Sequence, residues 1–107
     1  MGEAKTEFVK KELKKLKRIV NKKIRIDKFI LFGSRARNEE LLTSDVDVIA
    51  ISDSFKGVNF RKRPLIFLNN WKLPVDLEIL CYSKDEIKKR KNEIGIIHEA
   101  LKTGISI

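Results

Sequence analysis

The sequence is poor in the residues and segments that mark several classes of protein. Its one cysteine, Cys81, has no partner for an internal disulfide and excludes a cysteine-rich zinc site. No apolar run approaches the roughly 18–20 residues that a membrane span needs. The first residues also lack the apolar stretch of a secretory signal. We therefore expect a cytoplasmic protein that does not use a membrane.

Acidic residues are scarce in the first quarter of the chain. Residues 1–26 contain ten Lys or Arg and three Glu, whereas residues 27–107 contain fourteen basic and twelve acidic residues. The net charge of +9 is therefore concentrated in one segment. Apolar residues recur there at helical spacing, at Val9, Leu13, Leu16, Val20 and Ile24. The basic face of such a helix binds a phosphate backbone, binds an acidic partner or is simply exposed to solvent. The sequence leaves these alternatives open.

The chain has the size of one domain, because its 107 residues contain no linker, repeat or low-complexity segment. Short apolar and β-branched runs predict strands at 27–32, 45–51 and 75–82. Helical segments lie between and around them. We therefore expect a single α+β domain over residues 1–107, in which helices pack on a small mixed sheet of about three main strands.

Capping residues and prolines set the expected helices. These are residues 9–24, a turn or two behind Ser34, a helix from Pro64 through Trp71, one behind Ser83 and one from Gly95 to about Thr103. Phe67, Leu68 and Trp71 are expected to form a core face. The run Arg61-Lys62-Arg63 is interpreted as solvated, and Cys81 as a buried, inert thiol.

Three aspartates on the predicted strands favour a metal site. Side chains two residues apart on a strand share a face and lie roughly 6.6 Å apart, so Asp45 and Asp47 point the same way. Two such carboxylates raise each other's proton affinity, and a divalent cation removes that repulsion. Hard oxygen ligands at this spacing suit Mg²⁺ or Mn²⁺. Asp76, near the start of the next strand, is placed to complete the site, and Glu78 shares its face.

A glycine-serine pair stands where the first predicted strand meets a helical turn. Gly33 lets the backbone approach a ligand closely, and the start of a helix offers free N–H groups. Ser34 has a hydroxyl to donate to a phosphate oxygen, and Arg35 and Arg37 have the charge to neutralise one. Ten residues separate Ser34 from Asp45. A phosphate cradle is therefore predicted beside a carboxylate metal site, which is what a metal-bound triphosphate requires.

The segments FGSRARNEELLTSDVDVIAIS and LPVDLEILCYS resemble the DNA polymerase β-type nucleotidyltransferase superfamily, specifically its minimal nucleotidyltransferases. The resemblance covers most of the chain and implies a palm-like fold. It also implies transfer of a nucleoside monophosphate, AMP in the case of ATP, to an acceptor hydroxyl with two Mg²⁺ ions. One departure is Asn38, where many members have glycine.

The resemblance also implies a role for each matching residue. Gly33 and Ser34 match the signature that holds the triphosphate, and Arg37 matches a basic residue that contacts phosphate. Asp45 and Asp47 match the paired metal ligands. Asp76 matches the third carboxylate, which helps to hold the metal and is a candidate acceptor of the nucleophile's proton.

Minimal nucleotidyltransferases often work with a separate helical protein of the HEPN type. In some of these pairs the nucleotidyltransferase is an antitoxin that transfers AMP to a tyrosine of its partner, and the resemblance implies this role here. Two alternatives stay open: a module that binds nucleotide or toxin without catalysis, and an enzyme that modifies nucleic-acid ends. The acceptor, the preferred triphosphate and the oligomeric state, including a homo-oligomer, also stay open.

Overall fold

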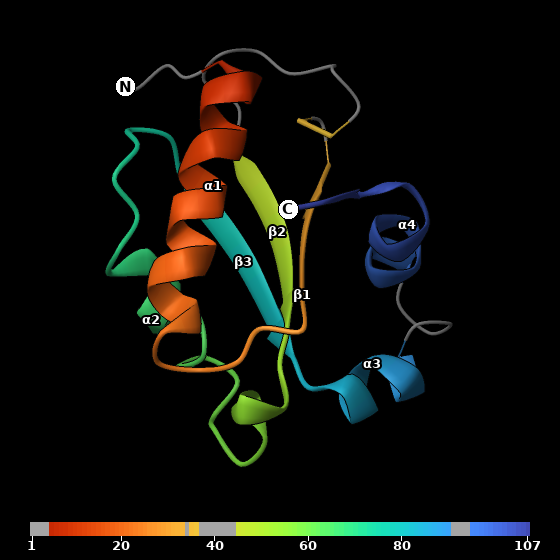
Figure 1. Cartoon of the computed structure of the whole chain (residues 1–107). Coiled ribbons are helices and arrows are strands. Elements are labelled where there is room, and N and C mark those ends of the chain that lie inside the picture. The colour runs from red at the N-terminus through yellow and green to blue at the C-terminus, as the bar shows by residue number, and fades with distance from the viewer. Residues whose placement is uncertain (1–4, 34, 37–44, 91–94) are drawn as a thin grey trace.

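The computed structural model describes residues 5–33, 35–36, 45–90 and 95–107, which form a mixed sheet between two layers of helices. The strands are β1 Lys28–Phe32, β2 Val46–Ile51, β3 Leu77–Tyr82 and β4 Ile105–Ser106. The helices are α1 Thr6–Asn21, the 3-10 turn η1 Asp53–Phe55, α2 Leu65–Leu68, α3 Lys84–Arg90 and α4 Gly95–Thr103. Figure 1 shows α1 and α2 on one side of the sheet and α3 and α4 on the other. The predicted α+β class is confirmed.

The order of strands across the sheet is β3-β2-β1-β4. β1 runs antiparallel to both of its neighbours, whereas β2 and β3 are parallel. The end of β1 and the beginnings of β2 and β3 therefore meet at one edge of the sheet. In this register Asp47 lies opposite Phe32 on β1 and opposite Glu78 on β3.

Side chains of β2 alternate between two apolar clusters. Val46, Val48 and Ala50 pack with the buried residues of α1, whereas Ile49 and Ile51 pack with residues of α3 and α4. Cys81 on β3 lies in the α1 cluster and is fully buried. Burial raises the pKa of its thiol to about 12, so the predicted inert cysteine is confirmed.

Helix α1 lies across the sheet with one apolar face. Val9, Leu13, Leu16 and Val20 are at most 2% exposed, and burying each such side chain contributes roughly 1.5–3 kcal/mol. Beyond the helix, the side-chain oxygen of Asn21 accepts a hydrogen bond from the backbone N–H of Ile26 at 2.9 Å, which turns the chain towards β1. None of the helices in the described residues is long and apolar enough to span a membrane.

Helix α2 is shorter than predicted. It begins after Pro64 as expected but ends at Leu68 after a single turn, and Leu68 is 42% exposed, so the prediction of this residue as core was wrong. Trp71 lies beyond the helix and donates its indole N–H to the carbonyl of Val75 at 2.8 Å. This bond and the turn at Asn69 and Asn70 replace the helical turn that Pro74 was expected to end.

Helix α3 begins with the predicted capping box. The N–H of Glu86 donates to the hydroxyl oxygen of Ser83 at 3.3 Å, and the N–H of Ser83 donates to the Glu86 carboxylate at 2.8 Å. The same carboxylate accepts two hydrogen bonds from Arg63, at 2.6 and 3.1 Å. Arg63 is 7% exposed, so its interpretation as part of a solvated run was wrong. Its guanidinium holds the loop after β2 against β3 and α3.

Candidate active site

Four acidic residues occupy the edge where β1 ends and β2 and β3 begin. Asp47 alternates with Val46 and Val48, so its side chain points to the face of the sheet covered by α3 and α4. Glu78 is its partner on β3, and Asp45 precedes it by two residues. Asp76 is fixed through its backbone, because its carbonyl accepts a hydrogen bond from the N–H of Val46 at 2.8 Å.

The electrostatics of this edge centre on Asp47. This residue is half-buried, whereas Asp45, Asp76 and Glu78 are exposed. Burial raises the pKa of the Asp47 carboxyl from 3.8 to about 6, with further contributions from its hydrogen bond to the Glu78 carboxyl and from the charges of Glu78 and Asp45. Asp47 therefore carries a carboxyl group whose ionisation is opposed by its surroundings and assisted by any cation that binds beside it.

Gly33 brings the chain after β1 into close contact with Asp47. Its φ of +77° is one that L side chains rarely adopt. A Cβ atom at this position would lie 2.5 Å from the Asp47 carboxylate oxygen Oδ2, which is closer than real Cβ atoms approach. The backbone then turns, with the N–H of Ala36 donating to the carbonyl of Gly33 at 3.1 Å. Only glycine therefore permits both this turn and its approach to Asp47.

The structure describes some of the sequence-predicted site residues and not others. It places Asp47 against Gly33, and the charge of Asp45 acts on the Asp47 carboxyl. Asp76 directly precedes β3 at the same edge. No three of the described His, Cys, Asp and Glu side chains, however, are gathered into a group that could hold a metal ion. The Mg²⁺ site, with Mn²⁺ as its alternative, stays a prediction.

The phosphate-binding prediction falls partly outside the described residues. Ser34 and Arg37 lie in the segments that are not described, as do most residues of the helical turn expected behind Ser34. Arg35 is fully buried and has an interaction partner. Its direct contact with phosphate stays a prediction, and its burial favours a part in holding the turn after Gly33.

Glu78 belongs to this site more closely than the sequence alone indicated. Its carboxyl group meets that of Asp47 because β2 and β3 are parallel and in a register that pairs the two residues. The sequence placed Glu78 on the same face as Asp76 but gave no register between the strands. The available signal was the spacing in Asp76-Leu77-Glu78, which repeats the spacing of Asp45 and Asp47.

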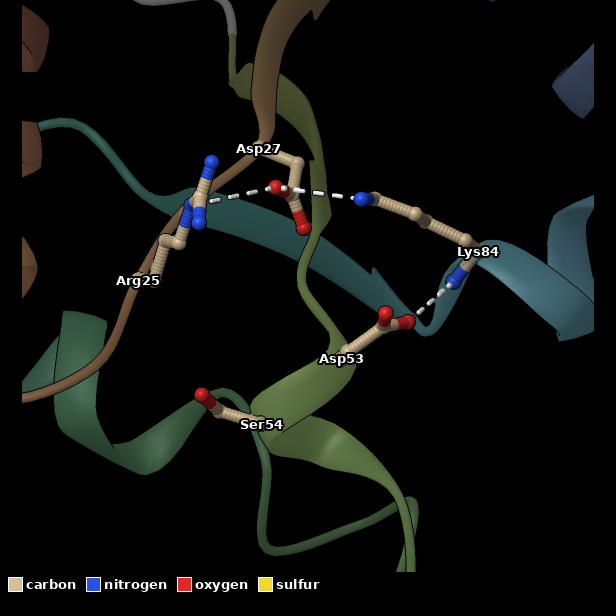
Figure 2. Close-up of a pocket in the computed structure, with 5 residues that line it drawn as sticks. All are labelled: Arg25, Asp27, Asp53, Ser54 and Lys84. Carbon is tan, nitrogen blue, oxygen red and sulfur yellow. Dashed lines mark hydrogen bonds and ion pairs between the residues drawn. The ribbon is translucent and has the colours of Figure 1, made fainter.

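A cavity of about 380 Å³ lies at the opposite end of the sheet and contains none of the predicted site residues. Figure 2 shows Asp27 between Arg25 and Lys84, with Asp53 and Ser54 below them. Asp27 forms ion pairs with Arg25 at 3.7 Å and with Lys84 at 3.5 Å, and Asp53 accepts the backbone N–H of Lys84 at 3.2 Å. The charges drawn here satisfy one another, so this cavity is a weaker candidate than the acidic edge.

The sequence profile of the family described as a nucleotidyltransferase domain matches residues 13–102, which include both aspartate strands. The chain therefore belongs to the nucleotidyltransferase domain family, and its general activity is nucleotidyl transfer.

A solved structure shares the fold. The chain is similar to a crystal structure of a proposed nucleotidyltransferase from Sulfolobus solfataricus, with a TM-score of 0.52 and 22% sequence identity. The match covers 99% of this chain and 89% of the other. No curated protein matches the sequence significantly.

Proposed function

We propose that this protein transfers a nucleoside monophosphate from a triphosphate, ATP in the first instance, to an acceptor hydroxyl at the acidic sheet edge. The observation that carries the proposal is that the Asp47 carboxyl lies against Gly33 and is hydrogen-bonded to the Glu78 carboxyl, with Asp45 adding further negative charge. A fold does not gain stability by holding like charges together, whereas a cation-dependent active site requires them.

The donor set of the edge suits a divalent cation. Carboxylate oxygens are the ligands that Mg²⁺ and Mn²⁺ prefer, and a cation offsets the repulsion that raises the pKa of Asp47. We propose Asp45, Asp47 and Asp76 as the metal ligands and Glu78 as a further carboxylate beside them. When bound, two Mg²⁺ ions supply charge neutralisation for the triphosphate and its leaving pyrophosphate.

We further propose which residues bind the phosphates and which accepts the proton during transfer. The backbone at Gly33 lies close to the phosphates, and the side chains of Ser34 and Arg37 bind them. Arg35 stabilises the turn after Gly33. The acceptor oxygen forms a bond to the α-phosphorus while the bond from that phosphorus to the pyrophosphate oxygen breaks. The proton of the acceptor hydroxyl passes to the carboxylate of Asp76, which is exposed and therefore open to an incoming acceptor.

The test is transfer of label from α-³²P-ATP to protein, RNA or small-molecule hydroxyls in the presence of Mg²⁺. Asp47→Asn and Asp76→Asn should each lower transfer at least about 100-fold. Asp85→Asn is the matched control, because Asp85 is an exposed aspartate on α3 at the other end of the sheet, and it should leave transfer unchanged. Near-normal transfer by either site variant contradicts the proposal. Binding of Mg²⁺-ATP without any transfer would favour a non-catalytic module instead.

For the acceptor we propose a tyrosine hydroxyl of a helical HEPN-type partner, and with it a cytoplasmic location and the antitoxin role of some minimal nucleotidyltransferases. The support is the resemblance of the two aspartate segments to that group. Incubation with such a partner and α-³²P-ATP should label the partner, and replacement of its acceptor tyrosine with phenylalanine should remove the label. Labelling of nucleic-acid ends in place of the partner would favour the end-modifying alternative.

A further inference from the structure

The outer face of α1 carries a continuous row of cations. Five basic residues that are exposed to solvent form this row, here named the basic strip: Lys11, Lys14, Lys15, Arg18 and Lys22. At 3.6 residues per turn they fall within about 100° of one another, directly opposite the buried face of Val9, Leu13, Leu16 and Val20. The strip is therefore presented outwards by a helix that the core holds in place.

Most of these cations are not neutralised within the protein. Lys15 forms an ion pair with Glu12 at 3.4 Å, on a side chain that is itself 60% exposed. Among the described residues, no carboxylate lies within ion-pair distance of Lys11, Lys14, Arg18 or Lys22. Lys15, Arg18, Ile19 and Lys22 line a shallow depression of about 390 Å³. The strip is thus an open surface with a net positive charge.

The strip and the acidic edge lie on opposite sides of the sheet. The buried residues of α1 pack with Val46 and Val48, whereas Asp47 alternates to the side covered by α3 and α4. Figure 1 shows the two helical layers on either side of the strands. A ligand on the strip is therefore separate from a triphosphate at the edge.

We propose that the basic strip binds the phosphate backbone of a nucleic acid. At 1.5 Å per residue, Lys11 and Lys22 are about 16 Å apart along the helix axis. One strand of a duplex presents about five phosphates over that length, at 3.4 Å per phosphate. The five cations of the strip thus extend over a length in which one strand of a duplex presents about as many phosphates.

Other occupants fit these observations less well. A helix binds a bilayer through its apolar face, and the apolar face of α1 is already buried against the sheet. An acidic protein would have to present a row of carboxylates of the same length, whereas every duplex strand presents such a row of phosphates. Apart from the ion pair of Lys15 with Glu12, the strip carries positive charge alone between residues 11 and 22, which favours a continuously charged partner such as a phosphate backbone.

The charge on the strip predicts a steep dependence on salt. Neutralising four to five phosphates gives a slope of about −4 for the logarithm of the association constant against the logarithm of salt concentration. Binding to a 20-base-pair, fluorescein-labelled duplex of mixed sequence, measured by fluorescence anisotropy, should therefore weaken about 200-fold between 50 and 200 mM NaCl.

Two triple variants distinguish the strip from net charge. Lys11→Gln, Arg18→Gln and Lys22→Gln together should bring the slope to about −2 and weaken binding at least tenfold at 100 mM NaCl. The matched control removes three exposed cations from other elements, as Lys28→Gln, Lys89→Gln and Lys102→Gln, and should keep most of the wild-type slope. Equal losses in the two triple variants would overturn the proposal.

Two further measurements use the wild-type chain and a competitor. On addition of the duplex, backbone amide resonances of α1 should shift in ¹H–¹⁵N spectra. Shifts centred on residues 45–47 and 76–78 would overturn the assignment to the strip. Unlabelled duplex and a 20-residue polyglutamate are compared as competitors at equal concentrations of negative charge. The duplex should displace the labelled probe at the lower concentration. Stronger displacement by polyglutamate would identify an acidic protein as the occupant. Nucleotidyl transfer should be retained by the strip variant, so the two proposals fail independently.

Discussion

At the residue scale, the surroundings of Asp47 disfavour the ionised form of its carboxyl group. Its folded-state pKa of about 6 lies above its ordinary value of 3.8. The folded chain therefore binds a proton more tightly than the unfolded chain, and ionisation above pH 6 costs folding free energy. Stability from this group is present at low pH and is lost as the pH rises through about 6.

Asp47→Asn should consequently raise stability while removing transfer. At pH 7 the variant should gain about 1–2 kcal/mol, a value reduced for the partial exposure of this edge. The gain should disappear near pH 4, where the wild-type carboxyl is protonated in the folded state. Urea unfolding at both pH values measures this gain. An Asp47→Asn protein that is less stable than the wild type at pH 7 would contradict the claim that ionised Asp47 destabilises the fold.

Glu86 has the opposite pH dependence. Its hydrogen bonds with Arg63 lower its pKa from 4.5 to about 2, with a further contribution from Ser83. A depressed carboxyl pKa gives stability that is present above pH 4.5 and is lost as the pH falls towards 2. Because the Glu86 side chain is 36% exposed, we expect about 1–2 kcal/mol rather than the full value of the shift.

Glu86→Gln tests this assignment. The variant should lose about 1–2 kcal/mol at pH 7, and its stability should approach that of the wild type as the pH falls from 4.5 to 2. Asp85→Gln provides the control, since Asp85 is its exposed neighbour and lacks the Arg63 contact. A stability difference between wild type and Glu86→Gln that does not change over this pH range would show that the pair does not act through charge.

At the scale of elements, α1 contributes most of its stabilisation through one face. Leu13 is fully buried at the middle of that face, against β-strand residues of the same cluster. Leu13→Ala should cost about 3 kcal/mol, from lost burial and the cavity left behind. The exposed Lys14→Ala is the control and should change stability by less than about 0.5 kcal/mol. A small loss for Leu13→Ala in chemical denaturation would mean that α1 is not docked as described.

The elements that the sequence predicts well are those whose own residues determine them. The apolar runs of β1 and β2 and the Ser83-to-Glu86 capping box are local signals, and each appears where expected. The two-residue strand β4 has no local signal, because it is defined by its pairing with Ile30 and Leu31. The end of α2 was misplaced because Pro74 is a stronger breaker in the sequence than the turn that stops the helix at Leu68.

The same distinction holds for the candidate site. The shared face of Asp45 and Asp47 follows from the two-residue period of a strand. The contact between Asp47 and Glu78 depends on the register of two parallel strands, and the burial of Arg63 depends on a partner 23 residues away. Such contacts between distant residues form only in the tertiary fold, so they cannot be predicted from the spacing of residues along the chain.

At the scale of the whole molecule, the sheet separates a small group of acidic residues from a row of basic residues. The acidic edge lies on the side of α3 and α4, and the basic strip lies on the outer face of α1. Under the two proposals, a nucleic acid bound to the strip would leave the acidic edge open to a triphosphate and an acceptor. The basic residues concentrated in 1–26 thus lie mainly on a surface that is separate from the acidic edge.

The most direct test of the central claim is a crystal structure with Mg²⁺ and an ATP analogue whose α,β-bridging oxygen is a methylene group. We predict metal density between the carboxylates of Asp45 and Asp47 and the phosphates, with the triphosphate against the turn at Gly33. A triphosphate bound elsewhere with full occupancy, for example in the cavity of Arg25 and Lys84, and an acidic edge without metal would contradict the account.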